Sequence, residues 1–571
     1  MNNKVTRRIF LKQGLIATST LLVPWKLFAE KPVNTINLTI LHTNDIHGYI
    51  TKSIAEWADP DFPPDLGGGS ALATLIKQVK MECKQKDRRF MLLDAGDIYQ
   101  GTPIGDESKG ATIVDFFNRM GYDCWTLGNH DFDDGDKNVE KLISASKMPV
   151  LSSNTRSSKN KKEFPYGIKP YIIKNVDGLK IGILGITTED MITLVPKEKL
   201  PEIVFTNVAP TVNKYILELK KQEVQFIILL SHLGFPRVDD GLSRRLKRFN
   251  KYRKNADARK FPNYTAYLNF IKKKKGFGLD DLEVTALIKN INLVIGGHSH
   301  IGIYPPYEVP ETHTFITQAY SRLSTVGRID LSLDKDTGTI IGISIEAINL
   351  WGERFKPDND AEDYLRCQQD AVEKHLRRVI GKTETELQRG NYETTLGNVV
   401  TDAMRESVGA DVALVNRGGL RANIRIGEIQ EIDIYRVIPF DNPIHKMTVD
   451  GAMLANILEV SFSGRRKDSQ LSGVKVVVNP LLPSGRRLCE VCINGKPLDL
   501  KKQYTFATSA YLSDGAVGYG LLRKIQRDMV KESITVRKAV VQYIEKKTPL
   551  NVSLEGRIKI STKATRADYL P

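Results

Sequence analysis

The sequence predicts an α/β protein of at least two domains, and three observations support this prediction. The chain has 571 residues, which is too long for one hydrophobic core. From about Ile36 to Ile348, short apolar runs alternate with helical patterns such as Ser70 to Lys84, as is typical of layered α/β domains. From about Val379 to Ile560, further helical and β-type runs predict a smaller α+β domain.

The composition is typical of a globular protein, with 41% hydrophobic and 26% charged residues. No stretch of 18 or more apolar residues occurs, so we expect no integral membrane association. The five cysteines are too few and too irregularly spaced for a disulfide scaffold.

Residues 1 to 29 resemble a twin-arginine export signal. Arg7 and Arg8 precede the weakly apolar run Gly14 to Val23, and Ala29 stands at a possible cleavage point. The resemblance implies that the twin-arginine export machinery is a partner, that the signal is removed and that the protein is periplasmic. The alternative is a basic amphipathic helix that lies on a membrane surface.

Five strand-type runs end in side chains that bind metals or transfer protons. The most specific segment is Gly128 to Asp133, which follows the apolar run Tyr122 to Leu127. Since open α/β sheets place their ligand sites at the carboxyl ends of strands, we expect the five ends to converge on one pocket. Five of the nine histidines lie in these segments. The ligand-type residues are Asp45, His47, Asp97, Asn129, His130, His232, His298 and His300.

Two pairs of these residues have the same spacing. Asp45 and His47 are two positions apart, and so are His298 and His300. In an extended segment, side chains at this spacing lie on the same face. We therefore expect each pair to occupy an extended segment.

The order and spacing of these motifs resemble those of the calcineurin-like metallophosphoesterases. With its C-terminal half, the chain resembles a bacterial 5′-nucleotidase of the UDP-sugar hydrolase type. The resemblance implies a four-layer αββα metallophosphoesterase domain at 36–348 and a 5′-nucleotidase C-terminal domain at 379–560. Between them, Pro357 to Asp360 predict the cap of a linker helix within 350–378.

The resemblance also implies two divalent metal ions. The first would be bound by Asp45, His47, Asp97 and His300. The second would be bound by Asp97, Asn129, His232 and His298, so that Asp97 bridges the two. Mixed nitrogen and oxygen ligands suit Mn, Zn or Fe, and the sequence does not decide among them.

His130 is the residue that would act on the substrate beside the metals. The resemblance implies that Asp133 orients it and that it donates a hydrogen bond or a proton to substrate oxygens. The alternative is that His130 is itself a ligand. His300 departs from the family pattern, which often has an amide there, and in this respect the chain is similar to sulfate-releasing thiohydrolases.

The C-terminal half resembles the nucleotide-binding domain of the family. Phe440 and Tyr511 would stack on both faces of a base, and Asn416 and Arg421 would bind polar parts of the nucleotide. The alternative is that these aromatic residues belong to the core. Two positions depart from the family: Arg417 replaces a glycine, and Val517 replaces an aspartate that contacts the ribose.

A basic insertion separates His232 from His298. Residues 237 to 275 hold fourteen Lys or Arg against three Asp, and so contribute +11 of the formal net charge of +16. We interpret the insertion as a flap that attracts anionic substrate, against the alternative of a solvated loop. No stable binding of nucleic acid is expected.

These features predict an exported enzyme that uses two metals to hydrolyse nucleotides, small-molecule substrates, to nucleoside and phosphate. Two alternative activities on the same fold are a sulfate-releasing thiohydrolase and a 2′,3′-cyclic nucleotide phosphodiesterase. The non-enzyme alternative is a binding protein built on an inactive phosphatase.

Overall fold

The computed structural model describes residues 34–55, 64–195, 197–235, 278–310, 312–374, 376–439, 442–463, 469–525 and 534–570. The predicted export signal, the basic insertion 237–275 and Phe440 lie outside these residues.

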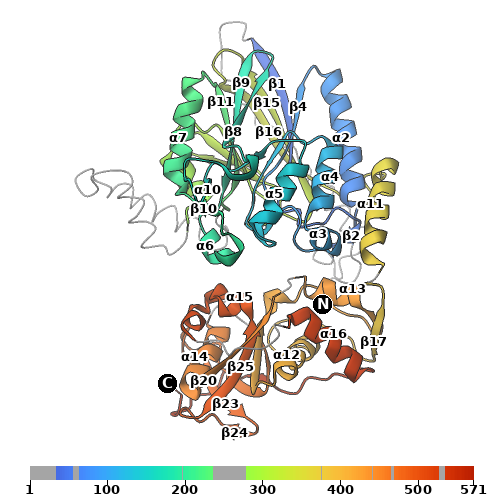
Figure 1. The fold of residues 1–571 in the computed structure, drawn as a ribbon, viewed down its shortest axis with the longest axis vertical. Coiled ribbons are helices and arrows are strands. Elements are labelled where there is room, and N and C mark those ends of the chain that lie inside the picture. The colour runs from blue at the N-terminus through green and yellow to red at the C-terminus, as the bar shows by residue number, and fades with distance from the viewer. Residues whose placement is uncertain are drawn as a thin grey trace, which may run out of the picture.

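Two six-stranded mixed sheets form the centre of the first domain (Figure 1). In spatial order, the first sheet contains β16 (Ile340–Asn349), β15 (Thr325–Asp334), β1 (Thr35–Thr43), β4 (Arg89–Asp94), β5 (Cys124–Thr126) and β6 (Val150–Leu151). The second contains β13 (Tyr307–Val309), β14 (Thr314–Gln318), β12 (Leu293–Gly296), β11 (Phe226–His232), β9 (Leu179–Thr187) and β8 (Tyr171–Val176). Strands β1, β4 and β5 run parallel, as do β9, β11 and β12. The ends that carry predicted ligands therefore point the same way within each sheet.

Helices cover both outer faces of this pair of sheets. Leu38 and Ile40 of β1 pack against side chains of the second sheet such as Ile183. Outside the first sheet lie α2 (Gly68–Gln85), α4 (Ala111–Met120) and α5 (Asp136–Ala145). Outside the second lie α7 (Val208–Lys221) and α10 (Asp281–Leu287). The order of the layers confirms the predicted αββα arrangement. The predicted ligands lie at strand ends of both sheets and not of a single sheet.

The linker between the domains contains α11 (Asn359–Glu373). Asp358 caps it, because the Asp358 carboxylate accepts the N–H of Ala361 at 3.1 Å. Ala361 and Leu365 are buried, and the helix packs against α2 and against α3 (Pro103–Glu107) of the first domain. The linker helix is therefore attached to the metallophosphoesterase domain (Figure 1).

The second domain has two four-stranded sheets. One contains, in order, β20 (Ile444–Asp450), β25 (Gln503–Ser509), β18 (Val412–Asn416) and β21 (Ser469–Ser472). The other contains β24 (Lys496–Pro497), β23 (Leu488–Ile493), β22 (Val474–Val478) and β26 (Ile558–Ile560). Helices α12 (Thr395–Val408) and α16 (Val536–Lys547) share one core, and α14 (Gly451–Phe462) contributes to another. The short pair β17 (Val379–Thr383) and β19 (Gly427–Gln430) leads into α13 (Glu431–Val437), and α15 (Ala510–Ser513) follows β25.

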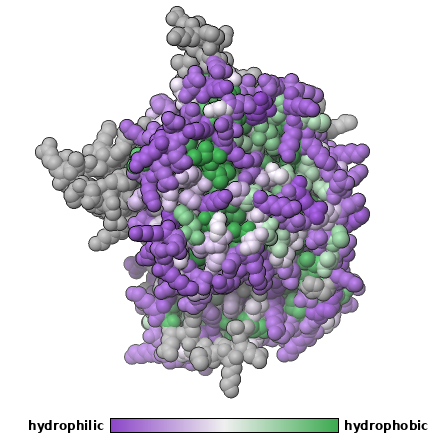
Figure 2. Space-filling view, turned by 45° about the horizontal axis from the view of Figure 1, so that its top comes forward, coloured by the Kyte–Doolittle hydropathy of each residue, from purple (hydrophilic) through white to green (hydrophobic). Residues whose placement is uncertain are grey.

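Among the described helices, none is long and apolar enough to span a lipid bilayer. The face of the molecule in Figure 2 is mainly hydrophilic, with smaller hydrophobic patches between the charged side chains.

Candidate metal centre

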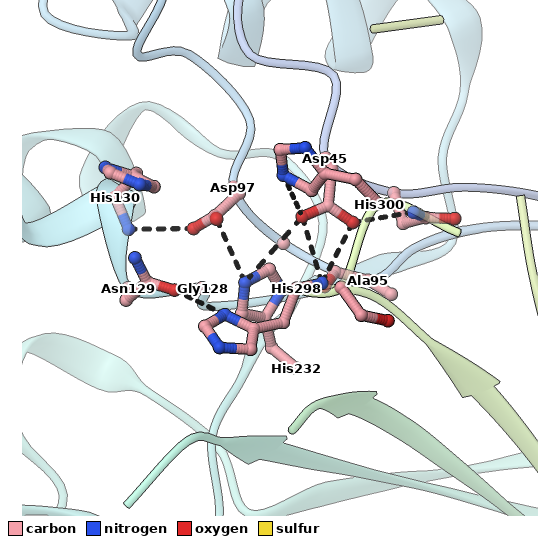
Figure 3. A network of polar contacts seen from close by, with 12 residues as sticks. Asp45, Ala95, Asp97, Gly128, Asn129, His130, His232, His298 and His300 are labelled. Carbon is pink, nitrogen blue, oxygen red and sulfur yellow. Dashed lines mark hydrogen bonds and ion pairs between the residues drawn. The ribbon is translucent and has the colours of Figure 1, made fainter. Parts of the chain in front are cut away.

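The structure brings the seven predicted metal ligands together where β1, β4, β5, β11 and β12 end (Figure 3). Potential ligand atoms lie within 4.8 Å of one another in two groups, and Asp97 belongs to both. The first group consists of Asp45, His47, Asp97 and His300. The second consists of Asp97, His232 and His298. Asn129 adjoins the second group, because its Oδ1 atom lies 2.8 Å from Nδ1 of His298.

Ring nitrogens and carboxylate oxygens approach one another closely in the first group. Nε2 of His47 lies 3.0 Å from Nε2 of His300, which in turn lies 3.2 Å from Oδ1 of Asp45. In the second group, Nε2 of His232 lies 3.0 Å from Oδ2 of Asp97. Imidazole nitrogens and carboxylate oxygens, which donate electron pairs to metals, converge here. This combination of ligands fits divalent cations that accept both nitrogen and oxygen.

Backbone carbonyls orient two of the imidazoles. Nδ1 of His47 lies 2.7 Å from the Gln100 carbonyl oxygen, and Nδ1 of His232 lies 2.6 Å from the Ala95 carbonyl oxygen. Since a carbonyl only accepts, each Nδ1 carries a proton and each Nε2 faces the cluster. Nε2 of His232 is buried and has no hydrogen-bond partner of suitable geometry. This buried atom supports the fit of a cation.

The electrostatics of the site keep Asp97 ionised and divide the imidazoles. Burial opposes charge on His232, but Asp97 and Asp45 raise its pKa to about 10, whereas His47 and His298 are neutral. Burial and the neighbouring His300 lower the pKa of His47 to about 3, and burial and His232 lower that of His298 to about 4. Burial opposes ionisation of Asp97, but His232 and His130 hold its pKa well below the usual value. Asp97 is therefore available as a charged ligand to both groups.

The backbone at five of the seven predicted ligands is left-handed, with φ between 50° and 72°: Asp45, His47, Asp97, His298 and His300. The expectation of extended segments at 45–47 and 298–300 is therefore wrong. Each such residue costs about 1–2 kcal/mol. Tertiary hydrogen bonds hold the first of these loops, since the N–H groups of Asp45 and His47 donate to the carbonyls of Gly96 and Asp97 at 2.8 and 3.0 Å.

Several residues that support the ligands were not predicted from the sequence. Asp131 is fully buried and accepts the N–H groups of Asp97, Ile98 and Gly128. Asn44 donates to Oδ2 of Asp45 at 2.6 Å. Both are direct neighbours of predicted site residues in the sequence, which is the only signal that could have identified them.

His130 lies beside the two ligand groups, on the short helix η1 (His130–Phe132). Its Nδ1 atom is 2.7 Å from Oδ2 of Asp133, the predicted orienting residue. Burial opposes the charged imidazole, but Asp133 and Asp97 raise the pKa of His130 to about 10. Asp133 thus holds the ring through Nδ1, which leaves Nε2 available to another partner.

A cleft of about 1780 Å³ lies between the two domains. Asp97, Asn129, His130, His298 and His300 line it on the metal side. On the other side it is lined by three predicted substrate-binding residues, Asn416, Arg421 and Tyr511, of which Tyr511 is 45% exposed. Burial and the nearby Arg322 lower the pKa of Arg421 to about 10, which still leaves its guanidinium charged at neutral pH. Val517 also lines the cleft, with a left-handed φ of 53°.

Both domains match known protein families. Residues 38–302 match the calcineurin-like phosphoesterase family, and residues 379–524 match the 5′-nucleotidase C-terminal domain. The chain is 26% identical to protein UshA of Yersinia enterocolitica, over 94% of this chain and 96% of that protein. It is 26% identical to a 5′-nucleotidase of Vibrio cholerae, over 95% and 98% of the two chains. The crystal structure of a 5′-nucleotidase precursor from Thermus thermophilus has a TM-score of 0.71 at 24% identity, over 92% of this chain and 99% of that one. These matches confirm the predicted two-domain fold.

Proposed function

Because the chain belongs to the 5′-nucleotidase family of calcineurin-like metallophosphoesterases, and so is a metal-dependent hydrolase, we propose that it hydrolyses nucleotides to nucleoside and phosphate. One observation carries the proposal. Asp97 and His130 line one wall of the cleft, which supports phosphate chemistry there, and Arg421 and Tyr511 line the other, which supports binding of the nucleoside part.

The metal centre fits two divalent ions, one held by Asp45, His47, Asp97 and His300 and one by Asp97, Asn129, His232 and His298. When bound, such ions supply Lewis acidity for the phosphoryl oxygens and lower the pKa of water so that it becomes a nucleophile.

The protein's own groups prepare the site for this chemistry. The carbonyls of Gln100 and Ala95 bind Nδ1 of His47 and His232, so that Nε2 of each ring would face a bound ion. His130 donates its Nε2 proton to an oxygen of the phosphoryl group or of the departing alcohol, while Asp133 holds the ring by Nδ1.

The opposite wall selects the rest of the substrate. Tyr511 offers an exposed aromatic ring on which a base stacks, with Phe440 proposed for the other face. Arg421 and Asn416 line this wall and bind polar parts of the nucleotide away from the reacting phosphoryl group.

A substrate panel tests this function. We expect purified protein with Mn²⁺ to release phosphate from AMP and to lose this activity when the metal is chelated. A UDP-sugar, a 2′,3′-cyclic nucleotide and an S-sulfonated thiol complete the panel. Sulfate release from the thiol without hydrolysis of AMP would identify a thiohydrolase instead. Bound metal without turnover of any substrate would support a binding protein.

We further propose that residues 1–29 direct the protein through the twin-arginine pathway to the periplasm. The support is the sequence around Arg7 and Arg8. Replacing both arginines by lysine keeps the charge and removes the recognised pair, so we expect folded precursor to remain in the cytoplasm. Recovery of the double variant in the periplasmic fraction at the normal level would contradict the proposal.

A further inference from the structure

The wall of the cleft that belongs to the C-terminal domain is rich in arginine. Among its described lining residues, Asp514 is the single acid, and five are arginines: Arg389, Arg417, Arg421, Arg523 and Arg537. The guanidinium groups of Arg421 and Arg523 donate to main-chain carbonyls, those of Gly418 at 3.1 Å and Asp514 at 2.6 Å. A carbonyl has no net charge, so these contacts hold the two guanidinium groups without neutralising them. Since a nucleoside is neutral, this wall carries more positive charge than a nucleoside requires.

Arg523 lies beside the aromatic residue that is proposed to bind the base. Tyr511 is on the short helix α15, and Asp514 is the residue at the C-terminal end of that helix. Arg523 comes from the helix η7 (Gly520–Lys524), which packs against α15, and its Nε–H donates to the Asp514 carbonyl. Arg523 and Tyr511 both line the cleft. The positive charge of Arg523 is therefore held at the nucleoside end of the cleft.

The backbone next to this contact leaves room for the Arg523 side chain. Gly515 has a left-handed φ of 88°, and a Cβ atom added to it would collide with Nε of Arg523 and lie 3.1 Å from its Cδ atom. The side chain of Arg523 therefore lies directly against the Gly515 backbone. Because Nε is bound by the carbonyl, a ligand is left the two terminal NH₂ groups, which together suit two oxygens of one phosphate.

The position of Arg523 indicates which part of a substrate it contacts. A nucleotide whose reacting phosphate lies at the metal centre has its base at the other end, and the ribose joins the two. The second phosphate of a nucleoside diphosphate is attached to the reacting one, so it would stay near the wall of Asp97 and His130. A phosphate on the ribose is instead next to the base, on the side of Tyr511 and Arg523.

We propose that Arg523 binds a phosphate group on the ribose, and that the preferred substrates are nucleotides with a second phosphate there, such as adenosine 3′,5′-bisphosphate. In the reaction, the oxygen of water bonds to the phosphorus of the 5′-phosphate, the bond between this phosphorus and the 5′ oxygen breaks, and the 5′ oxygen takes a proton. The products are adenosine 3′-phosphate and phosphate. The inference rests on the proposed nucleotidase function.

The first test compares substrates on the full chain with Mn²⁺. We expect kcat/KM for adenosine 3′,5′-bisphosphate to exceed that for AMP by roughly 10-fold, the effect of a hydrogen bond between charged groups. ADP should show no such advantage over AMP. Added salt should reduce the advantage of the bisphosphate, because it screens the attraction between exposed charges. Chromatography of the products should show adenosine 3′-phosphate.

The second test removes the charge of Arg523. Arg523→Gln keeps a polar side chain, and AMP has no group that reaches this position. We therefore expect the ratio of kcat/KM for the bisphosphate to that for AMP to fall by roughly 10-fold, mainly through the KM for the bisphosphate. Arg436→Gln is the matched control, because Arg436 pairs with Asp433 at 3.2 Å in the same domain and is not among the residues that line the cleft. This variant should keep the wild-type ratio.

An unchanged ratio in Arg523→Gln would overturn the role of Arg523, and so would equal kcat/KM values for the bisphosphate and AMP in the wild type. Release of the 3′-phosphate, which leaves AMP, would show the opposite orientation and would also overturn it. A preference for ADP over the bisphosphate would assign the wall to diphosphates instead. If Arg523→Gln does not fold, the salt dependence of the wild-type ratio decides the question. A wild-type chain that hydrolyses no nucleotide contradicts the proposed function itself, whereas a nucleotidase without preference for the bisphosphate contradicts only this inference.

Discussion

The carboxylate of Asp131 holds the backbone of Asp97 in place: its Oδ2 atom accepts the Asp97 N–H at 3.0 Å. The same carboxylate accepts the N–H groups of Ile98 at 2.9 Å and Gly128 at 2.7 Å. One buried side chain thus joins the loops that follow β4 and β5, and both loops carry predicted ligands.

Asp131→Asn should weaken the metal centre without removing a ligand. Three N–H groups point at the two carboxylate oxygens, so an amide NH₂ must face at least one donor. We expect a loss of about 1–3 kcal/mol in the free energy of unfolding and a metal affinity lower by roughly 10- to 100-fold. Denaturant titration and metal titration measure the two effects. The surface variant Asp115→Asn is the control, and unchanged metal affinity in Asp131→Asn would refute the supporting role.

Asp97→Asn should be more damaging than the loss of any other single ligand, because only Asp97 belongs to both ligand groups. We expect both metals to be lost and activity to fall by more than about 100-fold. His300→Ala, which removes a ligand of the first group alone, should retain about one metal per chain. Elemental analysis of the purified variants gives the metal content, and two metals per chain in Asp97→Asn would rule out the shared ligand.

His130→Ala should separate catalysis from metal binding. The ring is held by Asp133 and is not part of either ligand group, so we expect both metals to remain bound. The kcat for AMP should fall by about 10²- to 10⁴-fold, as is usual for a lost general acid. Loss of metal from this variant would show instead that His130 is a ligand.

Tyr511→Ala should affect nucleotides selectively. Loss of base stacking typically costs about 1–3 kcal/mol, which should appear mainly as a higher KM for AMP. Hydrolysis of p-nitrophenyl phosphate should continue at nearly the wild-type rate, because this substrate does not reach the far wall. Steady-state kinetics on both substrates provide the measurement. If both rates decline together, Tyr511 has a structural role.

Glu82→Gln should lower stability in a pH-dependent way. Arg328 binds both carboxylate oxygens, at 2.8 and 2.9 Å, and this contact, with Lys86, lowers the pKa of Glu82 to about 2. Because the folded-state pKa of Glu82 lies below its unfolded value of 4.5, ionised Glu82 stabilises the folded protein at pH values above 4.5. This stabilisation is lost as the pH falls towards 2. Solvent screens this partly exposed pair, so we expect a loss of about 1 kcal/mol at neutral pH. Urea unfolding at about pH 7 and about pH 3 should show a smaller difference at the lower pH. A difference that is equal at both values would contradict the assignment.

Local patterns in the sequence were sufficient to identify the main elements and most of the site. The apolar spacing of 70–84 predicts a helix, and the structure contains α2 (Gly68–Gln85) there. The ligand-type residues after β4 and β11, Asp97 and His232, could be identified because each motif lies within a few residues of a strand end. Periodicity and short motifs are properties of neighbouring residues, so they can be read without knowing the path of the chain.

Only the tertiary structure shows how these pieces are oriented. His232 is directed at the cluster by the carbonyl of Ala95, 137 residues away, and the left-handed backbone of Asp45 is held by the carbonyl of Gly96. Such contacts form between segments that are far apart in the sequence, so they cannot be predicted from periodicity or from a local motif. The sequence could therefore name the ligands, while the tertiary contacts decided their backbone conformation and the orientation of their rings.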